Sequence, residues 1–177
     1  RAAVYIDGFL SASHDLDAGR FVASQRRTDG VVMSAMSTWG SVYGQWPLAY
    51  QALIALCAYR LTSCEGLLDW ARAAGQEYVS QPFPDDLAVP AMDAGLAVEL
   101  LADLFDVTGE RHWLEHGQRL AAQLIEVYVT GDLVRAAPGA DYYESQTVPG
   151  DLVHGLTRLA LLADGESEAL TSNYTCR

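Results

Sequence analysis

The sequence predicts an all-α protein of helical hairpins, in one domain (residues 1–177) that includes a short β-hairpin-like segment near residues 21–37. Three observations predict this fold. Apolar residues after residue 46 recur at three- and four-residue steps, the spacing of helix faces. A two-helix pattern repeats after about 46 residues, and such a period is typical of stacked helical hairpins. With 177 residues, 50% of them hydrophobic, the chain can form one sizeable core.

The region before residue 46 gives weaker signals. Residues 1–12 fit either a strand or the end of a helix, and the sequence leaves both open. FVASQRR (21–27) and VVMSAMS (31–37) have some β propensity and flank Thr28-Asp29-Gly30, a turn sequence. These residues predict the hairpin-like segment.

Two kinds of helix are expected to alternate after residue 46. The first kind is mostly apolar: WPLAYQALIALCAYRLTS from Trp46, VPAMDAGLAVELLADLFDVTG from Val89 and VPGDLVHGLTRLALLADG from Val148. The second kind carries more charge, as a helix with one wet face should: GLLDWARAAGQEYV from Gly66 and HWLEHGQRLAAQLIEVYV from His112.

The three apolar helices begin alike. Pro47, Pro90 and Pro149 suit the first turn of a helix, where a missing N–H costs nothing. Each helix then has a small residue at a matching position, which permits close approach of a neighbouring helix: Ala52, Gly95 and Gly155. We therefore expect three equivalent helices whose starting ends converge.

MDAGLAVELLADLFDVTGERHWLEHGQRLA (92–121), SQTVPGDLVHGLTRLALLADG (145–165) and LDAGRF (16–21) carry a resemblance to a known superfamily. The chain resembles the six-hairpin (α/α)-barrel carbohydrate-active proteins, which include unsaturated glucuronyl hydrolases and N-acylglucosamine 2-epimerases. The resemblance implies an (α/α) toroid whose inner helices direct their N-terminal ends at a sugar-binding cleft. Asp93 is placed where the glucuronyl hydrolases have an acidic residue, and Asp151 where the epimerases have His.

The length of the chain covers only part of such a ring. Each hairpin takes roughly 45–60 residues, so six hairpins need about twice this length. We expect a fragment or half of an (α/α) barrel, or a chain that associates with itself, because apolar flanks are otherwise left exposed.

The resemblance and the residues near the helix starts together predict a sugar site. Glycoside cleavage needs two carboxylates, and flat rings bind sugar faces. We expect Asp93 and Asp151 to be the carboxylate pair, Glu144 to be a substitute, and His154 to orient a group or relay a proton. The expected substrate-binding aromatic residues are Trp39, Tyr43, Trp46, Tyr50, Tyr142 and Tyr143.

These residues also have structural explanations. A carboxylate in the first turn, such as Asp93 or Asp151, stabilises a helix by capping it and by opposing its dipole. The other candidates fit ordinary packing: Trp46 as a hydrophobic staple, Tyr142 and Tyr143 over the core, and His154 within it.

Composition excludes several classes of function. The formal net charge of −12 argues against nucleic acid or an anionic membrane as partner. No apolar run approaches the roughly 20 residues of a membrane span. All 11 basic residues are Arg, which excludes a Schiff-base lysine and a Walker-type loop, and we expect no organic cofactor.

One metal motif is present. His112-Trp113-Leu114-Glu115-His116 matches H-x-x-E-H of the inverted zinc proteases. The repeat aligns it with residues 66–70, ordinary positions of an outer helix, and the third ligand that zinc needs is not specified. We expect no metal.

The leading prediction is a glycoside hydrolase or lyase that acts on an oligosaccharide. The alternative is a non-catalytic helical-repeat module that binds a protein partner on its concave face.

Overall fold

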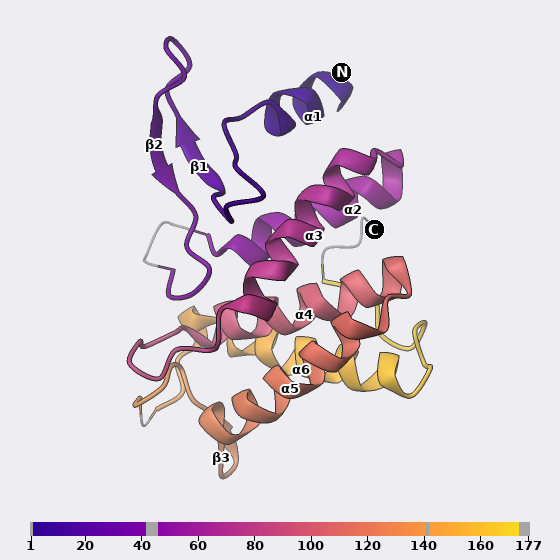
Figure 1. Ribbon diagram of the computed structural model, residues 1–177. Helices are drawn as coiled ribbons and strands as arrows, with labels where there is room; N and C mark the ends of the chain where they lie inside the picture. The colour runs from indigo at the N-terminus through magenta and orange to yellow at the C-terminus, as the bar shows by residue number, and fades with distance from the viewer. Residues whose placement is uncertain (1, 42–45, 141, 174–177) are drawn as a thin grey trace.

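Figure 1 shows a computed structural model of the chain, which describes residues 2–41, 46–140 and 142–173. The helices are α1 (Ala2–Leu10), α2 (Leu48–Thr62), α3 (Glu65–Ser80), α4 (Ala91–Thr108), α5 (Arg111–Tyr128) and α6 (Pro149–Ala163), with a 3₁₀ turn η1 (Ser145–Thr147). The strands are β1 (Val22–Gln25), β2 (Val32–Ala35), β3 (Val129–Thr130) and β4 (Leu133–Val134). The predicted all-α class with a short β segment is confirmed. Within the described ranges, none of the helices has the length and apolar character needed to cross a lipid bilayer.

The sequence repeat corresponds to two helical hairpins, α2–α3 and α4–α5. Their turns are alike: Ser63 and Gly109 both adopt the left-handed conformation, with φ of 54° and 70°. The hydroxyls of Thr62 and Thr108 each donate to the carbonyl four residues earlier. These pairs of positions differ by the same 46 residues as the sequence pattern, so the repeat is structural.

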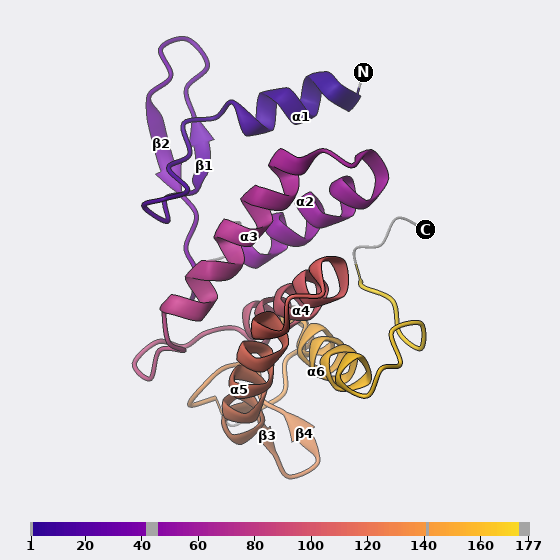
Figure 2. The same cartoon turned by 45° about the vertical axis from the view of Figure 1, so that its right-hand side comes forward.

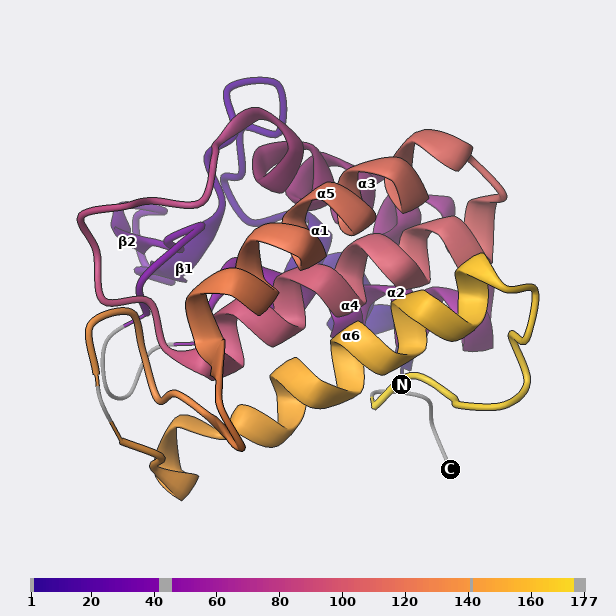
Figure 3. The same cartoon turned by 90° about the horizontal axis from the view of Figure 1, so that it is seen from below.

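Helices α2, α4 and α6 lie side by side and run in the same direction (Figures 1 and 3). Helices α3 and α5 form a second layer against them (Figure 2). Ion pairing of Arg60 with Asp103 joins the C-terminal parts of α2 and α4. Pro47, Pro90 and Pro149 therefore begin three parallel helices at one end of the bundle; the first two directly precede their helix, and Pro149 is the first helical residue.

Two glycines let α4 and α6 touch backbone to backbone. A Cβ added to Gly95 would lie 2.3 Å from the backbone nitrogen of Leu152, and one added to Gly155 would lie 2.5 Å from the carbonyl oxygen of Gly95. Neither distance leaves room for a side chain. The close approach predicted for these small residues is confirmed.

Helix α4 is the centre of the core. Residues 93–104 are buried without a break, because α2, α3, α5 and α6 all pack against this helix. Tyr128 of α5 is fully buried, and its hydroxyl donates to the carbonyl of Val89 at 2.7 Å. This bond fixes the segment that leads into α4.

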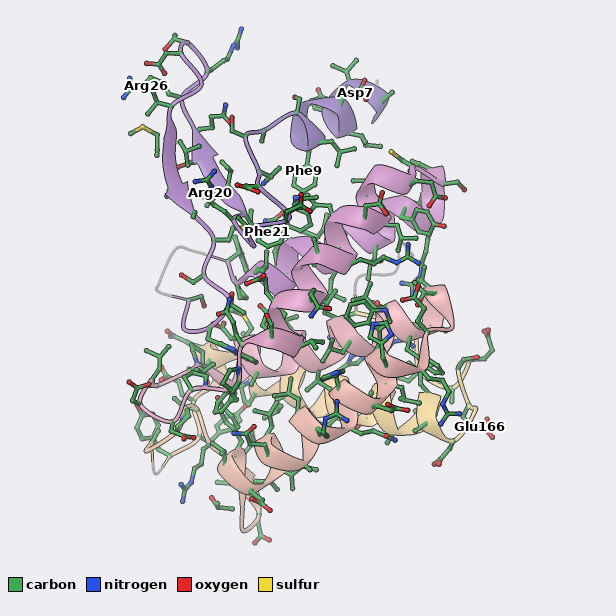
Figure 4. The ribbon with its side chains drawn as sticks, viewed as in Figure 1. Asp7, Phe9, Arg20, Phe21, Arg26 and Glu166 are labelled. Carbon is green, nitrogen blue, oxygen red and sulfur yellow. The ribbon has the colours of Figure 1, made fainter. Side chains whose placement is uncertain are left out.

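The N-terminal segment packs on α3. Residues 2–10 are helical, which answers the question left open by the sequence. The rings of Phe9 and Phe21 lie 5.0 and 4.9 Å from the ring of Trp70, and Figure 4 shows both directed toward the helices. Strands β1 and β2 pair antiparallel and turn at Gly30, whose φ is 74°. The hairpin predicted near residues 21–37 is confirmed.

Candidate functional site

A group of charged side chains lies inside the bundle, where α4 packs against α6. Glu99, Asp103 and Asp106 follow one another along α4 at helical spacing, and the first two are fully buried. Buried charges are rare unless they are paired or functional. The polar cluster, as we name it, consists of Arg60 of α2, these three residues of α4, and Asp151, His154 and Arg158 of α6.

One half of the polar cluster is neutral. Arg158 donates to Asp103 at 2.7 Å and to Asp106 at 3.0 Å. Arg60 contacts the same two carboxylates at 3.3 and 3.0 Å. Two positively charged guanidinium groups thus neutralise two carboxylates, and their ion pairs connect α2, α4 and α6.

Glu99 belongs to the other half and has no arginine partner among the described residues. Its carboxylate accepts hydrogen bonds from the Ser172 hydroxyl at 3.2 Å and from the backbone and side-chain nitrogens of Asn173 at 2.6 and 3.2 Å. Burial raises the pKa of Glu99, and the nearby charge of Asp103 adds to the rise, although the Asn173 amide and His154 oppose it. A buried acid of this kind keeps its proton to a higher pH than an exposed glutamate does.

Asp151 lies next to Glu99. The side-chain nitrogen of Asn173 is 3.2 Å from Glu99 Oε2 and 3.5 Å from Asp151 Oδ1, so the two oxygens are closer than the sum of these distances. Burial also raises the pKa of Asp151, and the charge of His154 lowers it. These two distances put an upper limit of about 6.7 Å on the separation of the oxygens, a limit that includes the spacing of about 5–5.5 Å between the carboxyl groups of retaining glycosidases.

His154 completes this half. Its Nδ1 is 3.3 Å from Glu99 Oε2, but the alignment is not that of a hydrogen bond, and no other partner for this buried atom is present in the described part of the chain. The imidazole can therefore orient Glu99 or exchange a proton with it after a small rotation.

An open groove of about 570 Å³ borders His154. Its floor is the outer face of α6, from Pro149 to Thr157, and its walls are the β3–β4 turn, Tyr143 and Leu170. Tyr143 is 52% exposed, so its ring is available to a ligand. The groove thus brings together a flat ring and the imidazole that faces Glu99, while Glu99 and Asp151 themselves are not among its lining residues.

The other predicted aromatic residues are divided among separate places. Trp46 is 54% exposed and stacks on Tyr50 with ring centroids 4.2 Å apart, before and within the first turn of α2. Tyr142 is exposed and lines a second groove with Arg135. Trp39 is only 9% exposed and packs edge-on between Tyr78 and Phe83, which makes it a core residue rather than a surface for sugars. Tyr43 lies outside the described residues.

Two predicted carboxylates lie apart from the pair. Asp93 is fully buried, and its two oxygens accept hydrogen bonds from the backbone nitrogen and hydroxyl of Ser41, both at 2.7 Å. It makes no side-chain cap to its own helix, nor does Asp151 to α6. Asp93 thereby joins the segment before α2 to the start of α4, an arrangement that favours a structural role. Glu144 precedes η1 and is half-buried, and none of its described contacts involves the polar cluster.

The role of Asp93 gives a pH-dependent prediction. Burial raises its pKa, although the Ser41 hydrogen bonds oppose this. The folded protein therefore binds the Asp93 proton more tightly than the unfolded chain does. The stability gained in this way is fully present below the ordinary pKa of aspartate and is lost as the pH rises through the pKa of Asp93 in the folded protein. We expect the stability of the wild type, relative to Asp93→Asn, to fall as the pH rises above about 4.

Urea unfolding between pH 3 and 8 measures this difference. The asparagine also loses one Ser41 hydrogen bond, at a pH-independent cost of about 1 kcal/mol. Asp85→Asn, at an exposed position, is the control and should show no such trend. A parallel pH dependence of the wild type and Asp93→Asn would contradict this account.

The H-x-x-E-H motif lies on α5, on the outer layer as the repeat predicts. His112 is half exposed and its ring lies 4.2 Å from the ring of Trp113. Within residues 2–41, 46–140 and 142–173, no three His, Cys, Asp or Glu side chains are arranged to hold a metal ion.

Comparison with known proteins gives no family for this chain. No protein-family model, no curated protein and no solved structure matches it. The site must therefore be interpreted from its own geometry.

Sequence reasoning missed Glu99, Asp103 and Arg158. A usable signal was present, because the three acidic residues that follow Asp93 in this mostly apolar helix, at positions 99, 103 and 106, share one face. An acidic stripe on a helix that is apolar elsewhere indicates buried, paired carboxylates.

Proposed function

We propose that the chain is part of a carbohydrate-active enzyme, a glycoside hydrolase, in which Glu99 and Asp151 are the catalytic carboxyl pair. The observation that carries the proposal is the pair itself: two carboxyl groups, bridged by one nitrogen, without an arginine partner among the described residues. The groove with Tyr143 and His154 gives the pair a neighbouring surface for a sugar.

The charge of the protein favours hydrolysis of a neutral saccharide over lyase chemistry. Lyases eliminate across uronic acid residues, and a uronate must be held beside a cation. Arg60 and Arg158 are already engaged by Asp103 and Asp106, and the chain carries a formal net charge of −12. A neutral sugar avoids the repulsion that an anionic one would meet.

The environments of the two acids assign their roles. Glu99, the more deeply buried, donates its proton to the glycosidic oxygen as the C1–O bond breaks. Asp151, half-buried at the start of α6, acts on the opposite face of the sugar, either by accepting a proton from the attacking water or by forming a bond to C1. His154 is a positioning residue for Glu99.

We also propose that the chain is a segment of an (α/α) toroid. The parallel set α2, α4 and α6 with α3 and α5 behind it supports this. Apolar side chains are exposed at both sides of the set: Tyr5 of α1 and Ile54 of α2 on one side, and Val148, just before α6, and Val153 of α6 on the other. Further hairpins or a second copy would cover these flanks.

The catalytic assignment is tested with a panel of neutral oligosaccharides: maltohexaose, cellohexaose, xylohexaose, mannohexaose and chitohexaose. We expect reducing ends to be released from at least one. Asp151→Asn and Glu99→Gln should each lower that rate about 10²–10⁴-fold, the usual contribution of acid–base catalysis.

Asp164→Asn, at an exposed position after α6, is the control and should retain the wild-type rate. Circular dichroism of each variant checks that the fold is kept. Equal rates for Asp151→Asn, Glu99→Gln and the control would remove the pair from the mechanism. Absence of binding to every sugar would favour the non-catalytic helical module.

A further inference from the structure

The segment after α6 covers the carboxyl pair. Residues 166–173 contain no helix or strand; they leave the end of α6 and run back along it (Figure 3). Glu166 marks the far turn in Figure 4, and Ser172 and Asn173 contact Glu99 in the middle of α4. We call residues 166–173 the strap.

Polar contacts attach the strap to the polar cluster. Arg158 donates to the carbonyl of Leu170, and Ser172 and Asn173 donate to Glu99 and Asp151. Most other strap residues are exposed, so little apolar burial opposes release. The segment is therefore bound where its donors meet the carboxylates.

The donors of the strap are of the kind that a saccharide offers. One hydroxyl and two N–H groups satisfy Glu99, and the hydroxyls of a sugar can replace all three. Because Ser172 and Glu99 are both buried, a ligand cannot reach Glu99 while the strap is in place. The groove lies beside the strap, since Leu170 and His154 both line it.

The strap begins at the C-terminal cap of α6. Gly165 has a φ of 83°, and a Cβ added there would meet nothing within 4 Å. The amides of Gly165 and Glu166 donate to the carbonyls of Leu162 and Leu161 at 3.2 and 2.8 Å, so this glycine caps α6 and the strap can move only beyond Glu166.

We propose that the strap is an autoinhibitory element, which occupies the Glu99–Asp151 pair in the free protein and is displaced when a saccharide binds. The inference rests on the proposed function for its ligand. The closed strap itself is a property of the chain that can be measured without any sugar.

The test compares the wild type with the double variant Ser172→Ala/Asn173→Pro, which removes all three donors to Glu99 because proline has no backbone N–H, by amide hydrogen exchange. We expect residues 166–173 to exchange at least about tenfold faster in the double variant, with α4 and α6 unchanged. Thr171→Ala, at an exposed strap position between the anchors, is the matched control and should exchange like the wild type. Equal exchange in all three proteins overturns the proposal.

Binding of the same five hexasaccharides gives the second measurement. If the strap is closed in about nine of ten molecules, opening it strengthens apparent binding about tenfold. We expect the double variant to bind tighter by this factor and Thr171→Ala to match the wild type. Equal affinity of the double variant and the wild type for a bound sugar overturns autoinhibition but leaves the sugar site intact. Faster strap exchange without binding of any sugar by either protein overturns the proposed function and the displacement step, and leaves only a structural strap.

Discussion

Gly95→Ala is expected to lower the free energy of unfolding by about 2–3 kcal/mol, because the added methyl group overpacks the contact between the helices. The higher helix propensity of alanine offsets at most about 1 kcal/mol of the destabilisation. The added methyl would meet the backbone of Asp151 and Leu152 at 2.3–2.5 Å. Backbone cannot rotate away as a side chain can, so α6 must shift. Urea unfolding measures the loss.

Gly150→Ala is the matched control, because it makes the same chemical change in α6 where nothing lies within 4 Å. It should leave stability unchanged or raise it by up to about 1 kcal/mol. Gly155→Ala meets the carbonyl of Gly95 and should behave like Gly95→Ala. The two losses should not add, because either one already separates the helices. Equal stability of Gly95→Ala and Gly150→Ala would show that α4 and α6 do not touch.

Arg158→Met is expected to cost about 3–5 kcal/mol, the usual effect of removing one partner from a buried ion pair. The side chains of Arg158 and Asp103 are 3% and 1% exposed, and the substitution leaves Asp103 buried with Arg60 as its cation. It also removes the bond to Leu170. Chemical denaturation, followed by far-UV circular dichroism, measures the change.

The control is Arg26→Met, which breaks the exposed Arg26–Asp29 pair of the hairpin and should cost about 0–1 kcal/mol. A second variant tests whether the unpaired charge of Asp103 causes the loss of stability. Adding Asp103→Leu to Arg158→Met removes the buried charge as well, and part of the lost stability should return. A double variant less stable than the sum of its single changes would mean that the charges are not the cause.

The helices could be predicted from the sequence because their signals are local. Apolar periodicity, the prolines at 47, 90 and 149, and the repeated turns depend on neighbouring residues, and the hairpins follow from them. The contact of Gly95 with Gly155 was also predictable, since small residues at matching positions permit close helices. The helix of residues 2–10 was not, because the segment is short and shows little periodicity.

The site was predicted only in part, because it depends on contacts between distant residues. His154 and Tyr143 line one groove, but Asp93 is held by Ser41, 52 positions earlier, which no local pattern indicates. Glu99 takes its place beside Asp151 because the helices cross at Gly95 and Gly155. The contribution of Ser172 and Asn173 depends on how a segment without helix or strand returns along α6, and sequence periodicity gives no information about such a path.

The glycine contact between α4 and α6 has an evolutionary consequence. The two glycines set how closely α4 and α6 approach, so the backbone positions that carry Glu99 and Asp151 follow from the packing of these helices. The β3–β4 turn, Tyr143 and the strap can then vary among descendants of this protein without moving the two acids. In the proposed sugar site, the acids would thus be positioned by the helices and the ligand recognised by the loops, so that loop changes alone alter specificity.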